Sequence, residues 1–169
     1  LLPISTHPEW GYRVEQLPNI EEVIKGFAAV KQRASDQSIR LSFHPDQFVV
    51  LNSPKEEVVE RSLIDLEYHG LMAEYLGADV VNIHAGGGYG DKVAALKRFE
   101  ANFARLSDRA QSWLTVENDD RVFTPSDLLP LCRELQIPFV YDVHHHRCLP
   151  DELTVKEASL QALATWNRE

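Results

Sequence analysis

The sequence predicts an α/β fold in which parallel strands alternate with helices and form part of a (β/α)₈ TIM barrel. Four short apolar runs have the composition of buried strands, and helical patterns lie between them. Each run also ends in a residue whose side chain can bind a metal ion. In a barrel the C-terminal ends of all strands meet at one mouth, whereas in an open doubly wound sheet they spread along an edge. We therefore favour the barrel.

The predicted strands are continuous apolar runs, as expected where both faces of a parallel sheet are covered. They comprise Ile39–His44, Asp79–His84, Trp113–Glu117 and Pro138–Asp142. A complete barrel needs about 250 residues, and the chain has 169. We expect a single domain, residues 1–169, that forms the N-terminal and central part of a barrel and lacks the C-terminal strands.

The longest helical pattern runs from Pro54 to Gly77. Ser53 and Pro54 suit the N-cap and the first helical position, and Gly77 suits the C-terminal end. Similar patterns predict one helix over Asp91–Ala110, another from Thr124 and Pro125 through Leu135, a further helix capped by Thr154, and an earlier one over about Asn19–Ala34.

Composition limits the classes of partner. The net charge of −9 argues against a protein that binds nucleic acid over its whole surface. It does not exclude a local site, because carboxylates around divalent metal ions present positive charge once they are loaded. No apolar run approaches the ~20 residues needed to span a bilayer, so no membrane partner is expected. Cys132 and Cys148 are too few for a disulfide framework and predict buried free thiols of a cytoplasmic protein.

The strand ends carry the residues with the most informative chemistry. They supply His44, His84, Glu117 and Asp142, with His145 three residues later. Imidazole and carboxylate ligands together suit Zn²⁺, Mn²⁺ or Fe²⁺. A single histidine at a strand end is often an ordinary loop residue, but an unpaired buried carboxylate costs several kcal/mol and needs a partner. Four successive ligand-type strand ends therefore predict a metal site at the barrel mouth.

The run from Asp142 to His146 leaves two arrangements open. If the strand continues, alternation puts Asp142 and His144 on one face. If the chain turns out after Val143, His145 swings back over the mouth instead. His144 and His146 are expected to support the ligands or to face solvent.

Two loops at the expected mouth contain residues that could contact bases or phosphate groups. In the first, Gln47 lies beside Phe48, and an amide next to an aromatic ring can fill a gap in a base stack. The alternative is that Phe48 only anchors the loop to the barrel. The second loop, Ala85–Gly90, fits neither the dinucleotide fingerprint nor the P-loop. It is either a flexible turn or a loop whose N–H groups approach a phosphate.

Together these motifs resemble those of the UV damage endonuclease family. His44–Phe48 resembles the His-Pro-Gly-Gln-Tyr segment of that family. The resemblance continues, in order, through Leu2–His7, Asn82–Gly87, Glu117–Asp120 and Asp142–His146, and covers essentially the whole chain. It implies a TIM barrel of the xylose isomerase-like type, related to the abasic-site nucleases of the endonuclease IV type.

The resemblance also implies an activity and roles for residues. The activity is DNA repair: metal-dependent incision of damaged double-stranded DNA on the 5′ side of UV photoproducts and some other lesions. The implied cofactor is a cluster of divalent metal ions, typically Mn²⁺, with Zn²⁺ or Mg²⁺ as alternatives. His44, His84 and Glu117 would bind one ion, Glu117 would bridge to a second ion held by Asp142, and His145 would belong to a third. Glu117 and His7 would be catalytic, Gln47 and Phe48 would probe the lesion, and the protein is expected to be a monomer.

The sequence departs from the family pattern at several places. Phe48 replaces a tyrosine, so stacking is retained but a hydroxyl is lost, and Asp46 replaces a glycine. Further ligands of the family, in a Lys-x-His segment and a later His and Glu, would fall beyond Trp166. The chain as written is thus expected to hold part of the cluster, which could leave it inactive. The alternatives are an abasic-site endonuclease or a sugar isomerase on the same scaffold, or a non-catalytic metal- or lesion-binding module.

Overall fold

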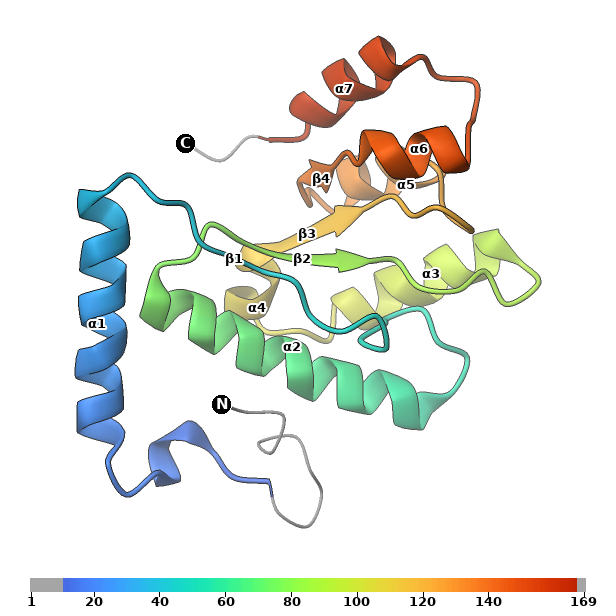
Figure 1. Cartoon of the computed structure of the whole chain (residues 1–169). Coiled ribbons are helices and arrows are strands. Elements are labelled where there is room, and N and C mark those ends of the chain that lie inside the picture. The colour runs from blue at the N-terminus through green and yellow to red at the C-terminus, as the bar shows by residue number, and fades with distance from the viewer. Residues whose placement is uncertain (1–10, 167–169) are drawn as a thin grey trace.

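The computed structural model describes residues 11–166 and shows strands that alternate with helices along the chain (Figure 1). Its strands are β1 (Ser42–Phe43), β2 (Val80–His84), β3 (Leu114–Glu117) and β4 (Phe139–Val140). Its helices are the short 3-10 helix η2 (Val14–Gln16), α1 (Ile20–Asp36), α2 (Glu56–Leu76), α3 (Lys92–Phe103), α4 (Asp108–Trp113), α5 (Pro125–Glu134), α6 (Val143–Cys148) and α7 (Val155–Leu163).

The four strands form one parallel sheet in the order β1-β2-β3-β4 (Figure 1). Each strand lies beside the strand that precedes it in the chain, so the described sheet has no point at which the strand order reverses. An open doubly wound sheet has such a reversal, whereas a barrel does not. The predicted α/β class and the partial barrel are therefore confirmed.

The outer strands β1 and β4 are shorter than the apolar runs predicted, and hydrogen bonds that involve side chains lie beside each of them. At the start of β1, the Leu41 N–H donates to Asp79 Oδ2, and the Asp79 N–H donates to Leu41 O. After β4, the Asn118 side chain forms hydrogen bonds with both backbone polar groups of Asp142. Its Oδ1 accepts from the Asp142 N–H and its Nδ2 donates to the Asp142 carbonyl, each at 2.9 Å. These contacts continue the sheet without regular strand pairing.

Two details of the predicted helices were wrong, the N-cap of α2 and the continuity of the helix after it. Helix α2 begins at Glu56 with Lys55 as its N-cap, and Ser53 accepts the Lys55 N–H before the helix starts. The predicted helix over Asp91–Ala110 is two helices, because Ser107 caps a new one by accepting the Ala110 N–H.

The remaining helix ends follow the sequence signals. Gly77 ends α2 at φ 63°, in the left-handed region that glycine adopts without steric cost. Thr124 and Thr154 cap α5 and α7 as predicted, each within a capping box. The thiol prediction holds for the buried Cys132 and was wrong for Cys148, which lies exposed near the end of α6. Within residues 11–166, no helix combines the length and the apolar character needed to cross a membrane.

Alternation along the two central strands separates an apolar face from a polar one. Val81, Ile83, Leu114 and Val116 belong to the hydrophobic core, which they share with residues of α2, α3, α4 and α5. Because successive side chains point to opposite faces, the intervening residues share the other face. These residues are Asn82 and His84 on β2 and their register partners Thr115 and Glu117 on β3. The core thereby fixes the backbone that carries the polar side chains.

Candidate metal centre

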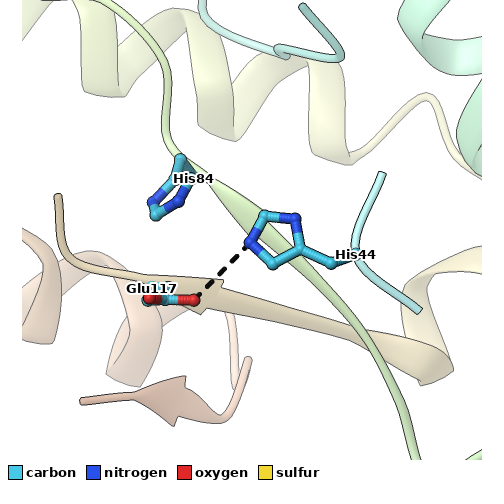
Figure 2. Close-up of side chains that lie close together, drawn as sticks. All are labelled: His44, His84 and Glu117. Carbon is cyan, nitrogen blue, oxygen red and sulfur yellow. Dashed lines mark ion pairs between the residues drawn. The ribbon is translucent and has the colours of Figure 1, made fainter. Parts of the chain in front are cut away.

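The ligand-type residues gather at the C-terminal ends of the strands. His44 follows β1 directly, His84 ends β2, and Glu117 ends β3 as the register partner of His84. Figure 2 shows the three side chains converging from three separate segments of the chain. One atom from each lies within 4.8 Å of the others, and the same holds for a second group, Glu117, Asp142 and His145. The strand ends therefore form two adjacent groups that could each hold a metal ion.

Glu117 belongs to both groups and offers a different oxygen to each. Its Oε2 lies 3.8 Å from His44 Nε2 (Figure 2), and its Oε1 lies 3.4 Å from His145 Nδ1. The Glu117 side chain is only 10% exposed, whereas that of His44 is 50% exposed. The carboxylate is thus the buried part of the site. One of its oxygens faces the group with His44, and the other faces the group with His145.

The second group depends on the turn that starts α6. The chain leaves the sheet after β4, and Asp142 caps the helix by accepting the N–H groups of His144 and His145 at 2.6 and 2.8 Å. Burial opposes the ionisation of Asp142, but these hydrogen bonds and the two nearby imidazoles outweigh it and hold the pKa of its carboxyl below the usual value. Of the two arrangements left open by the sequence, this is the one that turns His145 back toward Glu117.

Asn118 ties the second group to β3. Its side chain forms both hydrogen bonds to the backbone of Asp142 described above. Its backbone carbonyl oxygen also accepts a hydrogen bond from His145 Nδ1 at 2.9 Å. The same ring nitrogen lies 3.4 Å from Glu117 Oε1 and 3.7 Å from Asp142 Oδ2, so the contact with Asn118 fixes the imidazole beside both carboxylates. The Asn118 side chain is fully buried, so water does not compete for these contacts.

The residues present fit a divalent transition metal. One group has two imidazoles and a carboxylate, and the other has two carboxylates and an imidazole, sets that suit Mn²⁺ or Zn²⁺. His84 Nδ1 is buried and has no hydrogen-bond partner among the described residues. An unpaired buried nitrogen is costly, and a ligand at this site would offset the cost. The resemblance assigned His145 to a third ion, whereas the geometry groups it with Glu117 and Asp142.

A cavity of about 910 Å³ is lined by the histidines of both groups. Its lining includes His44, His84 and His145 together with Gln47 and Phe48. The Phe48 side chain is 75% exposed, so it is not packed on the barrel as a loop anchor. Asp46 Oδ1 accepts a hydrogen bond from the Phe48 N–H at 2.9 Å, which stabilises a turn in this loop. A glycine at position 46 would have no side chain to make this contact. The loop therefore presents Phe48 to solvent at the edge of the metal groups.

The glycine-rich loop lies along the same cavity and is tethered. Asn52 Nδ2 donates to the Gly87 carbonyl at 2.8 Å, and Arg98 Nε donates to the Asn52 carbonyl at 2.9 Å. Gly86 has a φ of 96°, and a Cβ there would lie 2.3 Å from Asn52 Oδ1. The flexible-turn interpretation is therefore not supported, and the approach of a phosphate to this loop stays a prediction.

The fold and the site can now be compared with known proteins. A family model described as UV-endonuclease UvdE matches residues 1–169. The chain belongs to this family.

Named relatives of the UvdE family come from bacteria and fungi. The chain is 36% identical to the UV DNA damage endonuclease of Bacillus pumilus over 172 residues, which cover 98% of the chain and 52% of the relative. It is 41% identical to the UV-damage endonuclease of Neurospora crassa over 167 residues, 95% of the chain and 25% of that protein. The chain thus spans about half the length of the bacterial relatives and about a quarter of the fungal one.

A solved structure agrees with the fold. The crystal structure of SacUVDE superposes with a TM-score of 0.87 at 31% sequence identity, covering 97% of this chain and 55% of that one. The parallel sheet and its helices are therefore those of the UvdE family.

Helix α6 of this UvdE-family chain is fixed by a buried polar chain. His146 Nδ1 contacts the Tyr141 hydroxyl at 2.7 Å and its Nε2 contacts Asp151 Oδ1 at 2.8 Å, and the His146 and Asp151 side chains are only 4% and 6% exposed. Burial alone would raise the pKa of Asp151, but hydrogen bonds from the N–H groups of Ser126 and Leu153 and from His146 lower it to about 2. His146 thus supports the ligands of α6, as one of the two expectations had it, while His144 is exposed.

Substituting Asp151 should destabilise the protein without removing a ligand. In the wild type both oxygens of Asp151 accept hydrogen bonds, whereas Asp151→Asn retains a single acceptor oxygen. We therefore expect a loss of about 1–3 kcal/mol in the free energy of unfolding at pH 7. Because the folded pKa is about 2 and lies below the unfolded value, the carboxylate's contribution is present above about pH 4 and is lost as the pH falls toward 2. Urea denaturation at falling pH measures this loss. The exposed Glu134→Gln should change stability by less than about 0.5 kcal/mol; an equal effect of both variants would contradict the account.

No role was predicted from the sequence for three polar residues of this site, and one residue with a predicted role, His7, is not among those that the structure describes. His7 lies outside the described residues, so its catalytic role stays a prediction. Asn82 and Asn118 form hydrogen bonds with ligand-type residues, and Thr115 donates to Asn82, but none of the three was given a role. A signal for two of them existed: Asn82 and Thr115 each precede a ligand by two residues in a predicted strand, and therefore share its face.

Proposed function

We propose that the chain forms the metal-binding part of a DNA repair endonuclease that incises the phosphodiester 5′ to UV photoproducts and related lesions. The observation that carries the proposal is the pair of ligand groups that share Glu117 beneath an exposed aromatic side chain, Phe48. Membership of the UvdE family and the names of the relatives support it. We further propose that residues 1–169 form one domain, the N-terminal and central part of a barrel, that acts as a monomer on damaged double-stranded DNA.

Hydrolysis of a phosphodiester needs stabilisation of negative charge, which metal ions held by these residues would provide. His44, His84 and Glu117 would hold one divalent ion, and Glu117, Asp142 and His145 a second; we propose Mn²⁺, with Zn²⁺ or Mg²⁺ as alternatives. Bound divalent cations supply the Lewis-acid chemistry of phosphodiester cleavage. Glu117 is buried between both groups, so it orients them relative to each other.

The remaining walls of the cavity suit a DNA strand. Lys55 and Arg121 line it beside Asp46, Asp119 and Asp120, so the positive charge offered to phosphates would come from the bound metal ions together with these two cations. Gln47 and Phe48 line the same cavity, where an aromatic ring could wedge into or stack on distorted bases and an amide could replace lost base hydrogen bonds. Metal ligands and base-contacting groups in one cavity distinguish a lesion-directed nuclease from a sugar isomerase.

A nicking assay tests the proposal. A duplex with one pyrimidine dimer, a duplex with one abasic site and an undamaged duplex are each incubated with the protein and Mn²⁺, or with EDTA. Where the natural reading frame exceeds 169 residues, that longer protein is assayed beside the chain. We expect Mn²⁺-dependent incision immediately 5′ to the dimer and none on undamaged DNA.

The other outcomes separate the alternatives. Cleavage of abasic DNA alone would replace the proposal with an abasic-site endonuclease. Metal-dependent binding to dimer DNA without incision by either form of the protein would indicate a non-catalytic lesion-binding module. Incision by the longer protein alone would assign the chain a partial site.

A further inference from the structure

We propose that Asn82, oriented by Thr115, is a positioning residue that holds the Glu117 carboxylate so that each of its oxygens serves one half of the metal centre. The inference rests on the proposed function, because it concerns how the proposed ligands are arranged. It assigns roles to two side chains that bind neither metal nor DNA.

The three residues form a continuous hydrogen-bonded chain across two strands. The Thr115 hydroxyl donates to Asn82 Oδ1 at 3.0 Å, and Asn82 Nδ2 donates to Glu117 Oε2. Asn82 and Thr115 are register partners on β2 and β3, and Glu117 lies two residues beyond Thr115 on the same face. The sheet itself therefore sets the alignment of donor and acceptor.

The Glu117 carboxylate selects which end of the Asn82 amide faces it, because an ionised carboxylate only accepts hydrogen bonds. With the amide reversed, Asn82 Oδ1 would face Glu117 Oε2, and two acceptors would be in contact without a proton between them. In the observed orientation the Thr115 hydroxyl donates to Asn82 Oδ1, so both ends of the amide have a partner and the amide is held in place. Thr115 thus acts on Glu117 through Asn82.

Burial makes this orientation effective. Thr115 is fully buried, and Asn82 and Glu117 are 9% and 8% exposed. Because so little of these side chains is exposed, each polar group depends mainly on its neighbour for a partner. Inward-facing positions of a barrel are usually filled with bulky branched apolar residues, so a layer of Asn and Thr directly beneath His84 and Glu117 is not what packing alone would select.

The consequence is a carboxylate with a fixed plane. Oε2 is held by Asn82 and lies on the side of His44, which leaves Oε1 on the side of His145. A carboxylate free to rotate about its last bond could turn both oxygens toward one group and leave the other with a single carboxylate, Asp142. Fixing the plane of the Glu117 carboxylate therefore keeps one of its oxygens available to each of the two metal-binding groups.

The test measures Mn²⁺ binding to the metal-free protein by calorimetry, and thermal unfolding in EDTA. Asn82→Leu removes the donor at similar volume, and we expect the affinity for Mn²⁺ to fall about 10–100-fold, as for other groups that orient metal ligands. Thr115→Val removes the hydroxyl alone and should cause a smaller loss in the same direction, whereas Thr115→Ser retains it and should bind as the wild type does. Asn102→Leu is the matched control, since Asn102 is also 9% exposed and its Nδ2 donates to a backbone carbonyl, that of Leu51.

The outcomes separate positioning from a structural role. The proposal predicts that Asn82→Leu and Asn102→Leu lower the unfolding temperature alike, while only Asn82→Leu weakens Mn²⁺ binding. Equal Mn²⁺ affinities in both variants and the wild type would overturn it, and would leave the metal centre and the endonuclease proposal standing. If Asn82→Leu does not fold, unchanged affinity in Thr115→Val overturns the proposal instead. A wild type that binds no Mn²⁺ overturns the metal centre as well.

Discussion

Replacing Glu117 with glutamine should lower metal-dependent incision by about 10³-fold, equivalent to about 4 kcal/mol of lost transition-state stabilisation. The side chain keeps its shape but loses the only charge shared by the two ligand groups. Its amide nitrogen would also face either Asn82 Nδ2 or His145 Nδ1, both of which now contact a carboxylate oxygen. Initial rates of nicking on dimer DNA, at saturating Mn²⁺, measure the loss.

Glu134→Gln makes the same chemical change on the exposed end of α5 and is expected to retain full activity. Calorimetry on both variants should show Mn²⁺ binding weakened in Glu117→Gln alone. If Glu117→Gln cuts within a few-fold of the wild-type rate, Glu117 does not bridge the two groups.

Replacing Phe48 with alanine should lower incision of dimer DNA by about 10–100-fold, since stacking of one base on an aromatic ring contributes about 1–3 kcal/mol. The side chain is 75% exposed, so its removal should leave the unfolding temperature unchanged. Gln47→Ala should act in the same direction, because the amide lines the same cavity and would replace lost base hydrogen bonds. Nicking rates on damaged duplexes and thermal unfolding measure the two effects separately.

Leu163→Ala is the matched control for Phe48→Ala, because Leu163 is 67% exposed on α7 and does not line the cavity. Neither substitution should alter Mn²⁺ affinity. Equal nicking rates for Phe48→Ala and the wild type on dimer DNA would remove Phe48 from lesion recognition and leave the ring without an assigned role.

The four strands and their parallel arrangement could be predicted because a buried parallel strand is a continuous apolar run. The break between α3 and α4 was missed for a physical reason. Phe103, Leu106 and Ala110 are all buried and continue a helical spacing across the break, so the apolar pattern outweighed the cap signal of Ser107 followed by Asp108. Helix α6 was not predicted at all, since its capping residue, Asp142, was assigned to the strand.

The ligand-type residues could be found from the sequence because all of them lie at or just after strand ends, where the fold brings them together. The residues that orient them could not, because their role depends on register. Asn82 meets Thr115 only in the observed pairing of β2 with β3, and a shift of one residue would put them on opposite faces. Asn118 likewise reaches Asp142 across 24 residues of sequence.

The most direct test of the central claim is anomalous diffraction from crystals grown with Mn²⁺. The claim is that the strand ends form two metal-binding groups joined by Glu117. It predicts two anomalous peaks, one in contact with His44, His84 and Glu117, and the other with Glu117, Asp142 and His145. Anomalous density only at sites away from these side chains, in protein that is folded and saturated with Mn²⁺, would contradict it.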